Sequence, residues 1–325
     1  MDGGSRGGAP VTGPGPVPAG TKPAPDQFAA QWGARGYLTP LDGPVHWIEF
    51  GPGGPATAPL VFVHGLGGSH LNWCQIGPRL AEGRRGVALD LHGFGLTPGS
   101  RRQATVRANT RLVDRFSREV TGTPVILVGN SMGGLISVLQ TASTPAAVAG
   151  LVLIDPALPV PARKPDWPVA GQFLLYALPG LGERFVRTMS RRPPEVAVRQ
   201  TIELCFADPS RADPAMVEAA VALVRRRRDT PSRDEPLLAA ARSLLRVVGR
   251  PRNYWAMMAG IRVPVLLIGG DADRLVPVAS MRQAAARNPR WQTTILAGVG
   301  HTPQLEAPGA VAGTIQDWLG RHFAG

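Results

Sequence analysis

Hydrophobic residues along the chain fall into short continuous runs that alternate with amphipathic stretches. After a turn signal at Asp42 and Gly43, "PVHWIEFG" has the composition of a strand in an opening hairpin. Later runs each end near Gly or Asp: "PLVFVHG", "GVALDLHG", "PVILVG", "GLVLID", "VPVLLIGG" and "WQTTILAG". Segments with a helical pattern, such as "TVRANTRLVDRFSREV", lie between several of them. This alternation predicts an α/β fold, a mostly parallel sheet with helices on both faces.

One interval breaks the alternation. From Asp155 to Val263 the chain runs 263 − 155 = 108 residues, whereas a strand-helix-strand unit takes roughly 30. The interval is rich in prolines and in amphipathic stretches such as "PGLGERFVRTMS". We therefore predict a helical cap, or lid, over residues 157–260, inserted into a core made of residues 28–156 and 261–325. A separate C-terminal domain is the alternative, but the strand-helix alternation resumes after the insertion as though the same sheet continued.

Two segments bear on location. Residues 1–27 are dense in Gly and Pro and lack the apolar run of a signal peptide, so we expect a disordered tail there. The most apolar later segment, "VAGQFLLYALPGLG", is interrupted by Pro179 and is shorter than the ~20 residues that cross a bilayer. We expect a cytoplasmic protein whose contact with a membrane, if it has one, is peripheral and made through the lid.

The formal net charge of +12 raises a nucleic acid or an anionic membrane as a partner. Nearly all the basic residues are arginines, scattered mostly in pairs, with one run at Arg225–Arg228. The sequence has no basic helix with interleaved aromatic residues. A compositional bias toward Arg, Ala, Gly and Pro therefore explains the charge, and we expect no nucleic-acid partner.

Neither the cysteines nor the histidines predict a bound ion. Cys74 and Cys205 stand far apart and outside any Cys-x-x-Cys spacing, so they indicate buried thiols rather than a disulfide framework or a zinc site. Several histidines lack paired ligand spacing with Cys, Asp or Glu: His46, His70, His92 and His322. We therefore expect no metal ion.

A nucleotide cofactor is also not expected. "HGLGGSH" nearly matches the dinucleotide-binding pattern Gly-x-Gly-x-x-Gly, and Asp90 follows Gly67 by 90 − 67 = 23 residues. The match fails at its last position, because His70 stands where the third glycine lets helix and strand pack closely. We read Asp90 instead as a carboxylate that fixes its own loop.

The most informative corner lies in "PVILVGNSMGGLISVLQ", residues 124–140, where an apolar strand turns at once into an apolar helix. A residue at such a turn is held in a strained backbone conformation that exposes its side chain. Gly129 and Gly133, two positions either side of Ser131, let the strand and the helix pass closely. The corner therefore presents the Ser131 hydroxyl beside a helix N-terminus, where negative charge is stabilised.

A serine nucleophile needs a base and a group that orients the base. Asp273 follows the strand "VPVLLIGG", and His301 follows the last strand, so both lie at the sheet edge that presents Ser131. We expect His301 to accept the Ser131 proton and Asp273 to fix the His301 tautomer. Asp155 also ends a strand and is the competing acid, but it continues directly into Pro156 and the insertion.

Five segments in register resemble the alpha/beta-hydrolase superfamily, from about residue 36 to the end. They are "VFVHGLGGS" at 61–69, "LDLHGFGLTP" at 89–98, "VGNSMGG" at 128–134, "GGDADRLVP" at 269–277 and "GHTPQLEAP" at 300–308. The order Ser, Asp, His is also that of the superfamily. The resemblance implies an eight-stranded, mostly parallel sheet with the helical cap inserted after the sixth strand. It implies an oxyanion hole made by the Leu66 and Met132 backbone N–H groups, with His64 as a loop-shaping residue.

The serine indicates acyl transfer through an acyl-enzyme, and we expect a small carboxylic ester of lipophilic character, held under the apolar segments of the lid. Trp73, Phe94 and Trp167 are candidates to line that pocket. Carbon–carbon bond hydrolases can share "GNSMGG", but their histidine is typically followed by Trp, whereas Thr302 stands here. Other acyl transferases of the fold stay open. A non-catalytic scaffold is the alternative of another class, and such relatives usually lack a triad member.

Overall fold

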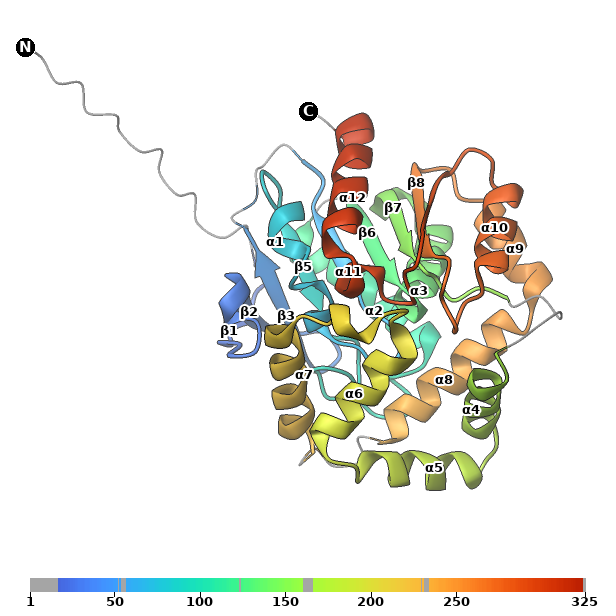
Figure 1. Ribbon diagram of the computed structural model, residues 1–325. Coiled ribbons are helices and arrows are strands. Elements are labelled where there is room, and N and C mark those ends of the chain that lie inside the picture. The colour runs from blue at the N-terminus through green and yellow to red at the C-terminus, as the bar shows by residue number, and fades with distance from the viewer. Residues whose placement is uncertain are drawn as a thin grey trace, which may run out of the picture.

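The computed structural model describes residues 17–51, 53, 57–122, 124–159, 166–228, 230 and 234–323. Its centre is one nine-stranded sheet with the order β1-β2-β3-β5-β4-β6-β7-β8-β9 (Figure 1). The strands are β1 (Lys22–Pro23), β2 (Arg35–Pro40), β3 (Pro44–Phe50), β4 (Leu60–Val63), β5 (Gly86–Leu89), β6 (Val125–Asn130), β7 (Val148–Ile154), β8 (Val265–Gly270) and β9 (Gln292–Leu296).

The predicted mostly parallel sheet is confirmed. The pairs from β1 to β3 and from β3 to β5 are antiparallel, and every pair from β5 through β4, β6, β7 and β8 to β9 is parallel. The sheet has nine strands rather than the expected eight, because β1 is a two-residue strand, too short to carry a hydrophobic alternation. The helical insertion consequently follows the seventh strand of the chain, β7.

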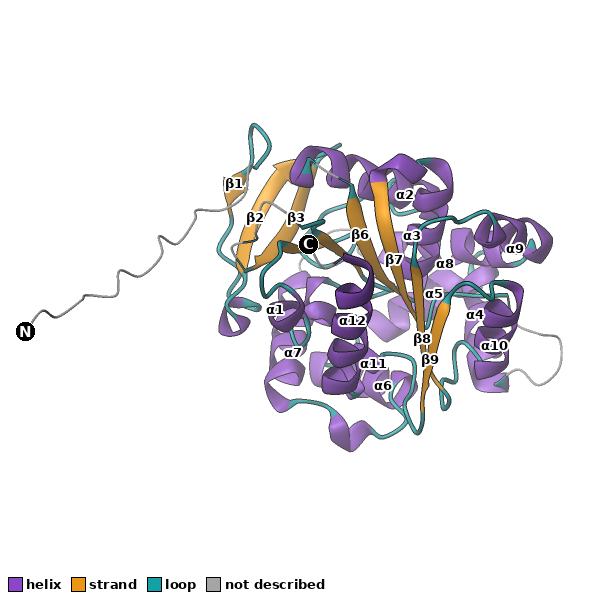
Figure 2. Ribbon diagram, turned by 90° about the horizontal axis from the view of Figure 1, so that it is seen from above, coloured by secondary structure: helices purple, strands orange, loops and turns teal. Residues whose placement is uncertain are grey.

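Helices cover both faces of the sheet (Figure 2). The side chains of β4 alternate between the two faces. Val61 and Val63 of β4 belong to a core cluster with α2 (Val106–Phe116) and α3 (Met132–Ser143). Leu60 and Phe62 belong to a second cluster with α1 (Gly77–Leu80) and α12 (Pro308–Phe323). Successive side chains of a strand point to opposite faces, so a strand covered on both sides must be apolar throughout. This is why the sequences of the central strands are continuous hydrophobic runs.

Helices fill the interval between β7 and β8. They are α4 (Trp167–Ala177), α5 (Leu181–Ser190), α6 (Pro194–Cys205), α7 (Pro214–Arg227), α8 (Asp234–Val248) and α9 (Pro251–Ala259). Figure 1 shows α5 to α7 gathered at one end of the molecule. Tyr176, Val186, Leu238 and Ala241 form a small hydrophobic cluster of their own between α4, α5 and α8. None of the helices among the described residues is long and apolar enough to cross a bilayer.

The remaining helices complete the layers around β8 and β9. α10 (Val278–Arg287) follows β8, and α11 (Pro303–Glu306) lies between β9 and α12. Short 3-10 helices occur at η1 (Ala30–Trp32), η2 (His70–Trp73), η4 (Pro145–Ala147) and η5 (Pro209–Arg211), and η3 (Ser117–Thr121) is a π-helical turn that extends α2.

The ordered chain begins before the expected boundary at residue 28. β1 pairs with β2, and Asp26 is 4% exposed and accepts hydrogen bonds from the Phe28 and Ala29 N–H groups. The Gly and Pro content suggested a disordered tail over residues 1–27, but strand pairing and a buried carboxylate hold residues 22–26 in place. Residues 1–16 of that predicted tail lie outside the described residues.

Substitution of Gly133, the second residue of α3, tests how closely this helix approaches β4. A methyl group at Gly133 would lie 2.0 Å from the Val63 carbonyl oxygen, so we expect Gly133→Ala to lower the free energy of unfolding by at least about 2 kcal/mol. Gly313→Ala in α12 is the control, because nothing lies within 4 Å of its new methyl group. It should be neutral or stabilising by about 0.5–1 kcal/mol in urea unfolding, and equal effects of the two substitutions would contradict the packing argument.

Candidate active site

Ser131 occupies the corner between β6 and α3. Its backbone has φ 53° and ψ −119°, a conformation that a non-glycine residue seldom adopts. A methyl group at Gly129 would lie 2.6 Å from the Gly133 carbonyl oxygen, so the strand and the helix pass too closely for side chains at these positions. The backbone strain and the glycine spacing predicted from the sequence are therefore both present.

Asn130 ties this corner to the two neighbouring loops. Its Nδ2 donates to the Ile154 carbonyl oxygen at 3.0 Å and to the His301 carbonyl oxygen at 3.2 Å. The side chain is buried, with 2% of its surface exposed. One amide thus holds the end of β7 and the loop after β9 against the serine corner.

His301 and Asp273 are in contact. His301 Nδ1 lies 2.6 Å from Asp273 Oδ2, and the other carboxylate oxygen, Oδ1, accepts the Leu275 and Val276 N–H groups at 2.7 and 3.0 Å. A carboxylate partner at Nδ1 keeps the proton there, which leaves Nε2 as the basic nitrogen. In the described part of the chain the Ser131 hydroxyl makes no hydrogen bond, so its pairing with His301 stays a prediction.

Asp155, the competing acid, lies beside Asp273 and plays a different part. It is fully buried, and its carboxyl oxygens accept the Gly270 N–H at 3.1 and 3.2 Å. Burial, together with the charge of Asp273, raises the pKa of Asp155 well above its ordinary value. The raised pKa favours the protonated form of Asp155, and the hydrogen bond to His301 belongs to Asp273.

The loop after β4 approaches Ser131 from the other side. A methyl group at Gly65 would lie 3.1 Å from the Ser131 Cβ, so this loop passes directly against the serine. Among the described residues, neither the Leu66 nor the Met132 N–H donates a hydrogen bond. Both groups remain available for an anionic oxygen, but the oxyanion hole itself stays a prediction.

His64 shapes this loop and does not take part as a base. It is fully buried, its Nδ1 lies 2.8 Å from the Gly65 carbonyl oxygen, and its Nε2 accepts the Leu91 N–H at 3.1 Å. Burial lowers the pKa of His64 to about 4. The imidazole is consequently neutral, with both nitrogens engaged by the backbone.

The three candidate pocket residues lie in different surroundings. Trp73 is fully buried with its ring 5.2 Å from that of Phe62, and Phe94 lies 5.7 Å from the His64 ring. Both belong to the hydrophobic clusters that flank the sheet. The Trp167 side chain lies outside the described residues. Whether any of them lines a substrate pocket stays a prediction.

Glu306 is a buried carboxylate to which the sequence analysis gave no role. It accepts the Ala207 and Asp208 N–H groups at 3.1 and 2.9 Å and the Gly300 N–H at 2.7 Å. It therefore joins the end of α6 to the loop that carries His301, as does the His301 N–H, which donates to the Cys205 carbonyl oxygen at 2.6 Å. The available signal was its place in "GHTPQLEAP", an acid between apolar residues shortly after the histidine.

The raised pKa of Asp155 gives a direct prediction. Asn resembles a protonated Asp, so Asp155→Asn should fold and keep at least about a tenth of whatever turnover Ser131, His301 and Asp273 support together. Asp273→Asn is the matched control, because it removes the charge that holds His301 in its reactive tautomer and should lower kcat about 10⁴-fold. Steady-state kinetics of both variants check this, and equal losses would show that Asp155 is the charged acid.

Comparisons with known proteins give the family. A family model described as the alpha/beta hydrolase fold matches residues 58–308. A pimeloyl-acyl-carrier-protein methyl ester esterase of Xanthomonas oryzae pv. oryzae is 32% identical over 267 residues, which is 82% of this chain and 95% of the esterase. A 2-hydroxy-6-oxononadienedioate/2-hydroxy-6-oxononatrienedioate hydrolase of Cupriavidus pinatubonensis is 25% identical over 90% of this chain and 98% of its own.

A solved structure is similar as well. The crystal structure of a membrane phospholipase A, described as a bacterial virulence factor, superposes with a TM-score of 0.68 and 25% sequence identity. The similarity covers 90% of this chain and 87% of the phospholipase.

Proposed function

Because this chain belongs to the alpha/beta-hydrolase family, we propose that it is a serine hydrolase that cleaves a carboxylic ester through an acyl-enzyme on Ser131. The observation that supports the proposal is the 2.6 Å contact between His301 Nδ1 and Asp273 Oδ2, together with a serine held at φ 53° whose neighbour Asn130 donates to the His301 carbonyl oxygen at 3.2 Å. An imidazole oriented by a carboxylate is the base that makes a serine hydroxyl nucleophilic.

The proposed reaction uses these groups in turn. His301 Nε2 accepts the Ser131 proton as Oγ attacks the ester carbonyl carbon, and the carbonyl π electrons move to its oxygen. The Leu66 and Met132 N–H groups stabilise that oxyanion. The intermediate then collapses with loss of the alkoxide, which takes the proton from His301. Water, deprotonated by His301, attacks the acyl-enzyme by the same route, releases the acid and returns the proton to Ser131.

A lipophilic substrate is the finer part of the proposal. The inserted region exposes large apolar side chains on α4, α5 and their connection: Leu174, Leu178 and Leu181. An acyl chain covered by such residues gains about 25 cal/mol per Å² of apolar surface buried, whereas a polar chain gains little. The names of two relatives, one an esterase and one a phospholipase, support an ester as the bond that is cleaved.

The carbon–carbon bond hydrolases are the second candidate, because one relative carries that activity in its name. They share the serine corner, so the corner cannot distinguish the two reactions. Thr302 after the histidine favours the ester. Acyl transfer to an alcohol or thiol would use the same acyl-enzyme, and it would appear as a product other than the free acid when such an acceptor is added.

The proposed role of Ser131 as the nucleophile can be tested by substitution and by labelling. Ser131→Ala should lower kcat for p-nitrophenyl esters at least about 10⁴-fold, since the nucleophile is removed, and should abolish labelling by a fluorophosphonate probe. Wild-type turnover should rise with acyl-chain length. Ser143→Ala, an exposed serine at the end of the same helix, is the control and should keep both activity and labelling.

Peptide mapping of the labelled protein makes the outcome decisive. A labelled peptide that contains Ser131 supports the proposal. Label elsewhere, or undiminished turnover in a folded Ser131→Ala variant, contradicts it and leaves a non-catalytic scaffold as the better interpretation.

Contact with an anionic membrane through the inserted region is a further prediction. Arg184 and Arg187 are exposed on α5, which begins at the exposed Leu181, so apolar and cationic groups share one helix. We expect the protein to sediment with phosphatidylglycerol vesicles more than with phosphatidylcholine vesicles at low salt, and less so at high salt. Joint replacement of Leu174, Leu178 and Leu181 by Ser should weaken this binding. Equal sedimentation with both lipids would refute it.

A further inference from the structure

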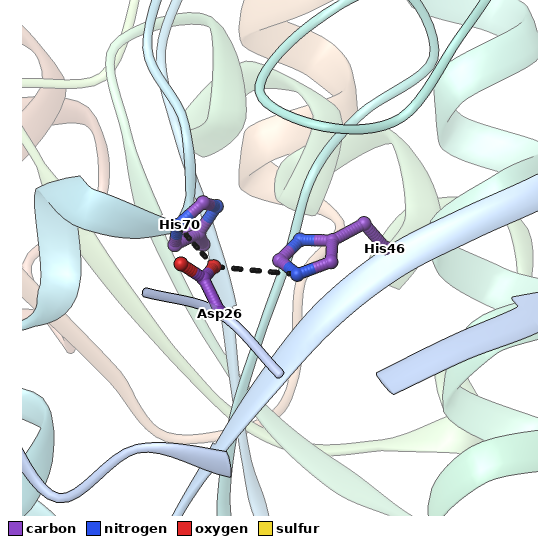
Figure 3. Close-up of side chains that lie close together, drawn as sticks. All are labelled: Asp26, His46 and His70. Atoms are coloured by element: carbon purple, nitrogen blue, oxygen red, sulfur yellow. Dashed lines mark ion pairs between the residues drawn. The ribbon is translucent and has the colours of Figure 1, made fainter. Parts of the chain in front are cut away.

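Three buried side chains from distant parts of the sequence converge at the start of η2 (Figure 3). They are Asp26 in the N-terminal segment, His46 on β3 and His70 at the first position of η2. Asp26 Oδ2 lies 2.9 Å from His70 Nε2 and 3.3 Å from His46 Nε2. One ligand-type atom of each residue lies within 4.8 Å of the other two, and each residue is at most 4% exposed.

A fourth residue, Asp90, holds both imidazoles from their far side. Its Oδ2 lies 2.9 Å from His46 Nδ1 and 2.8 Å from His70 Nδ1. The carboxylate is itself fixed by the His70 and Leu96 N–H groups, at 2.7 and 2.8 Å. Since a carboxylate only accepts, both Nδ1 atoms carry the hydrogen, and each ring turns its Nε2 toward Asp26.

The atoms that face one another lack hydrogen-bond geometry. In the described part of the chain, Asp26 Oδ2, His46 Nε2 and His70 Nε2 are buried without a hydrogen-bond partner, although their separations are those of ion pairs. The other Asp26 oxygen, Oδ1, already accepts two backbone N–H groups, so it cannot relieve them. Lone pairs that meet in a buried space are costly unless a positive charge lies between them.

We propose that Asp26, His46 and His70 bind a divalent transition-metal ion, with zinc as the best match. Imidazole nitrogen and carboxylate oxygen bind Zn²⁺ at about 2.0–2.2 Å, and ligand atoms of such a tetrahedral site stand roughly 3.3 Å apart. The 3.3 Å separation between Asp26 Oδ2 and His46 Nε2 matches this value, and the 2.9 Å separation to His70 Nε2 is shorter. These three atoms supply three of four ligands and leave the fourth position to water.

The surroundings have the form that metal sites require. A metal-bound histidine usually donates its other ring N–H to a carboxylate, which sets the tautomer, and Asp90 serves both histidines in this way. The two carboxylates, Asp26 and Asp90, also balance the charge of a dication in a buried site. The proposal departs from the sequence-based expectation of no metal, which rested on the absence of close ligand spacing.

Protons are the competing source of positive charge. Although burial opposes it, the carboxylates of Asp90 and Asp26 raise the pKa of His70 to about 9, so in the absence of a metal ion this ring would be a cation. Hydrogen bonds from imidazolium to carboxylate are short, about 2.7–2.9 Å, and nearly linear. The 2.9 Å separation at His70 lies in this range, so the argument for a metal ion rests on the 3.3 Å separation at His46 and on the absence, among the described residues, of a hydrogen-bond partner for either Nε2.

The ion would fasten η2, which lies outside the sheet, to segments that belong to the sheet or continue from it. It would link the N-terminal segment to β3 and to η2, and η2 begins directly after the loop of residues 64–69. That loop carries the Leu66 N–H, so the site would also hold the oxyanion loop in place, a consequence that rests on the proposed function. Metal binding itself does not depend on it.

Metal binding is measured on the untagged wild-type protein after it has been stripped with a chelator. We expect one Zn²⁺ per chain in competition with a chromophoric chelator, and a rise of several degrees in the melting temperature. Co²⁺ should give the visible absorption bands of a four-coordinate site, and Mg²⁺ should have no effect, since it prefers oxygen ligands. These readouts need no turnover, so their failure would leave the proposed serine hydrolase untouched.

Substitutions of the proposed ligands, and of the carboxylate that holds them, test where the ion binds. Asp26→Asn and His70→Gln should weaken Zn²⁺ binding at least about 100-fold, and Asp90→Asn about 10- to 100-fold. His322→Gln, which removes an exposed histidine of α12, is the control and should bind as wild type does. Stripped wild type that takes up no Zn²⁺ overturns the proposal and assigns the cluster to protons. That titration decides the matter even where a variant does not fold.

Discussion

The close passage of α3 across β4 and β6 is the constraint on which the rest of the structure depends. The gap between helix and strands is so narrow that a methyl group at Gly133 would collide with the Val63 carbonyl oxygen. At this tight turn Ser131 has a φ of 53°, in the left-handed region. The close packing of the helix and the strained backbone of the serine thus occur at one corner.

At the edge of the sheet beside this corner, buried polar side chains connect neighbouring loops by hydrogen bonds. Asn130 joins the ends of β6 and β7 to the loop of His301, Glu306 joins that loop to the end of α6, and Asp273 fixes the imidazole. All of these bonds except the part-buried one from the Ala207 N–H are buried, where an unpaired partner is costly, so these loops have little freedom to move independently. Rigidity of this kind is what positions a nucleophile and its base.

A second buried polar assembly lies beneath the loop after β4. Asp90 ends β5 and engages both His46 and His70, while Asp26 faces their opposite nitrogens. Two carboxylates and two imidazoles in an apolar interior are stable only when their charges balance, with protons or with a metal ion. Either way, the N-terminal segment becomes part of the folded core, although its composition is that of a flexible tail.

Local pattern by itself determined the parallel sheet, the helical insertion and the strained serine corner, because apolar runs, glycine spacing and turn chemistry act over a few residues. The resemblance to a known family supplied the order of the three residues proposed as catalytic. Only tertiary structure decided which polar groups are buried together. Asp26, His46 and His70 come from three separate segments, and the pKa of Asp155 is raised by burial and by Asp273 nearby. Such contacts are set by how distant strands align, and no short stretch of sequence records that alignment.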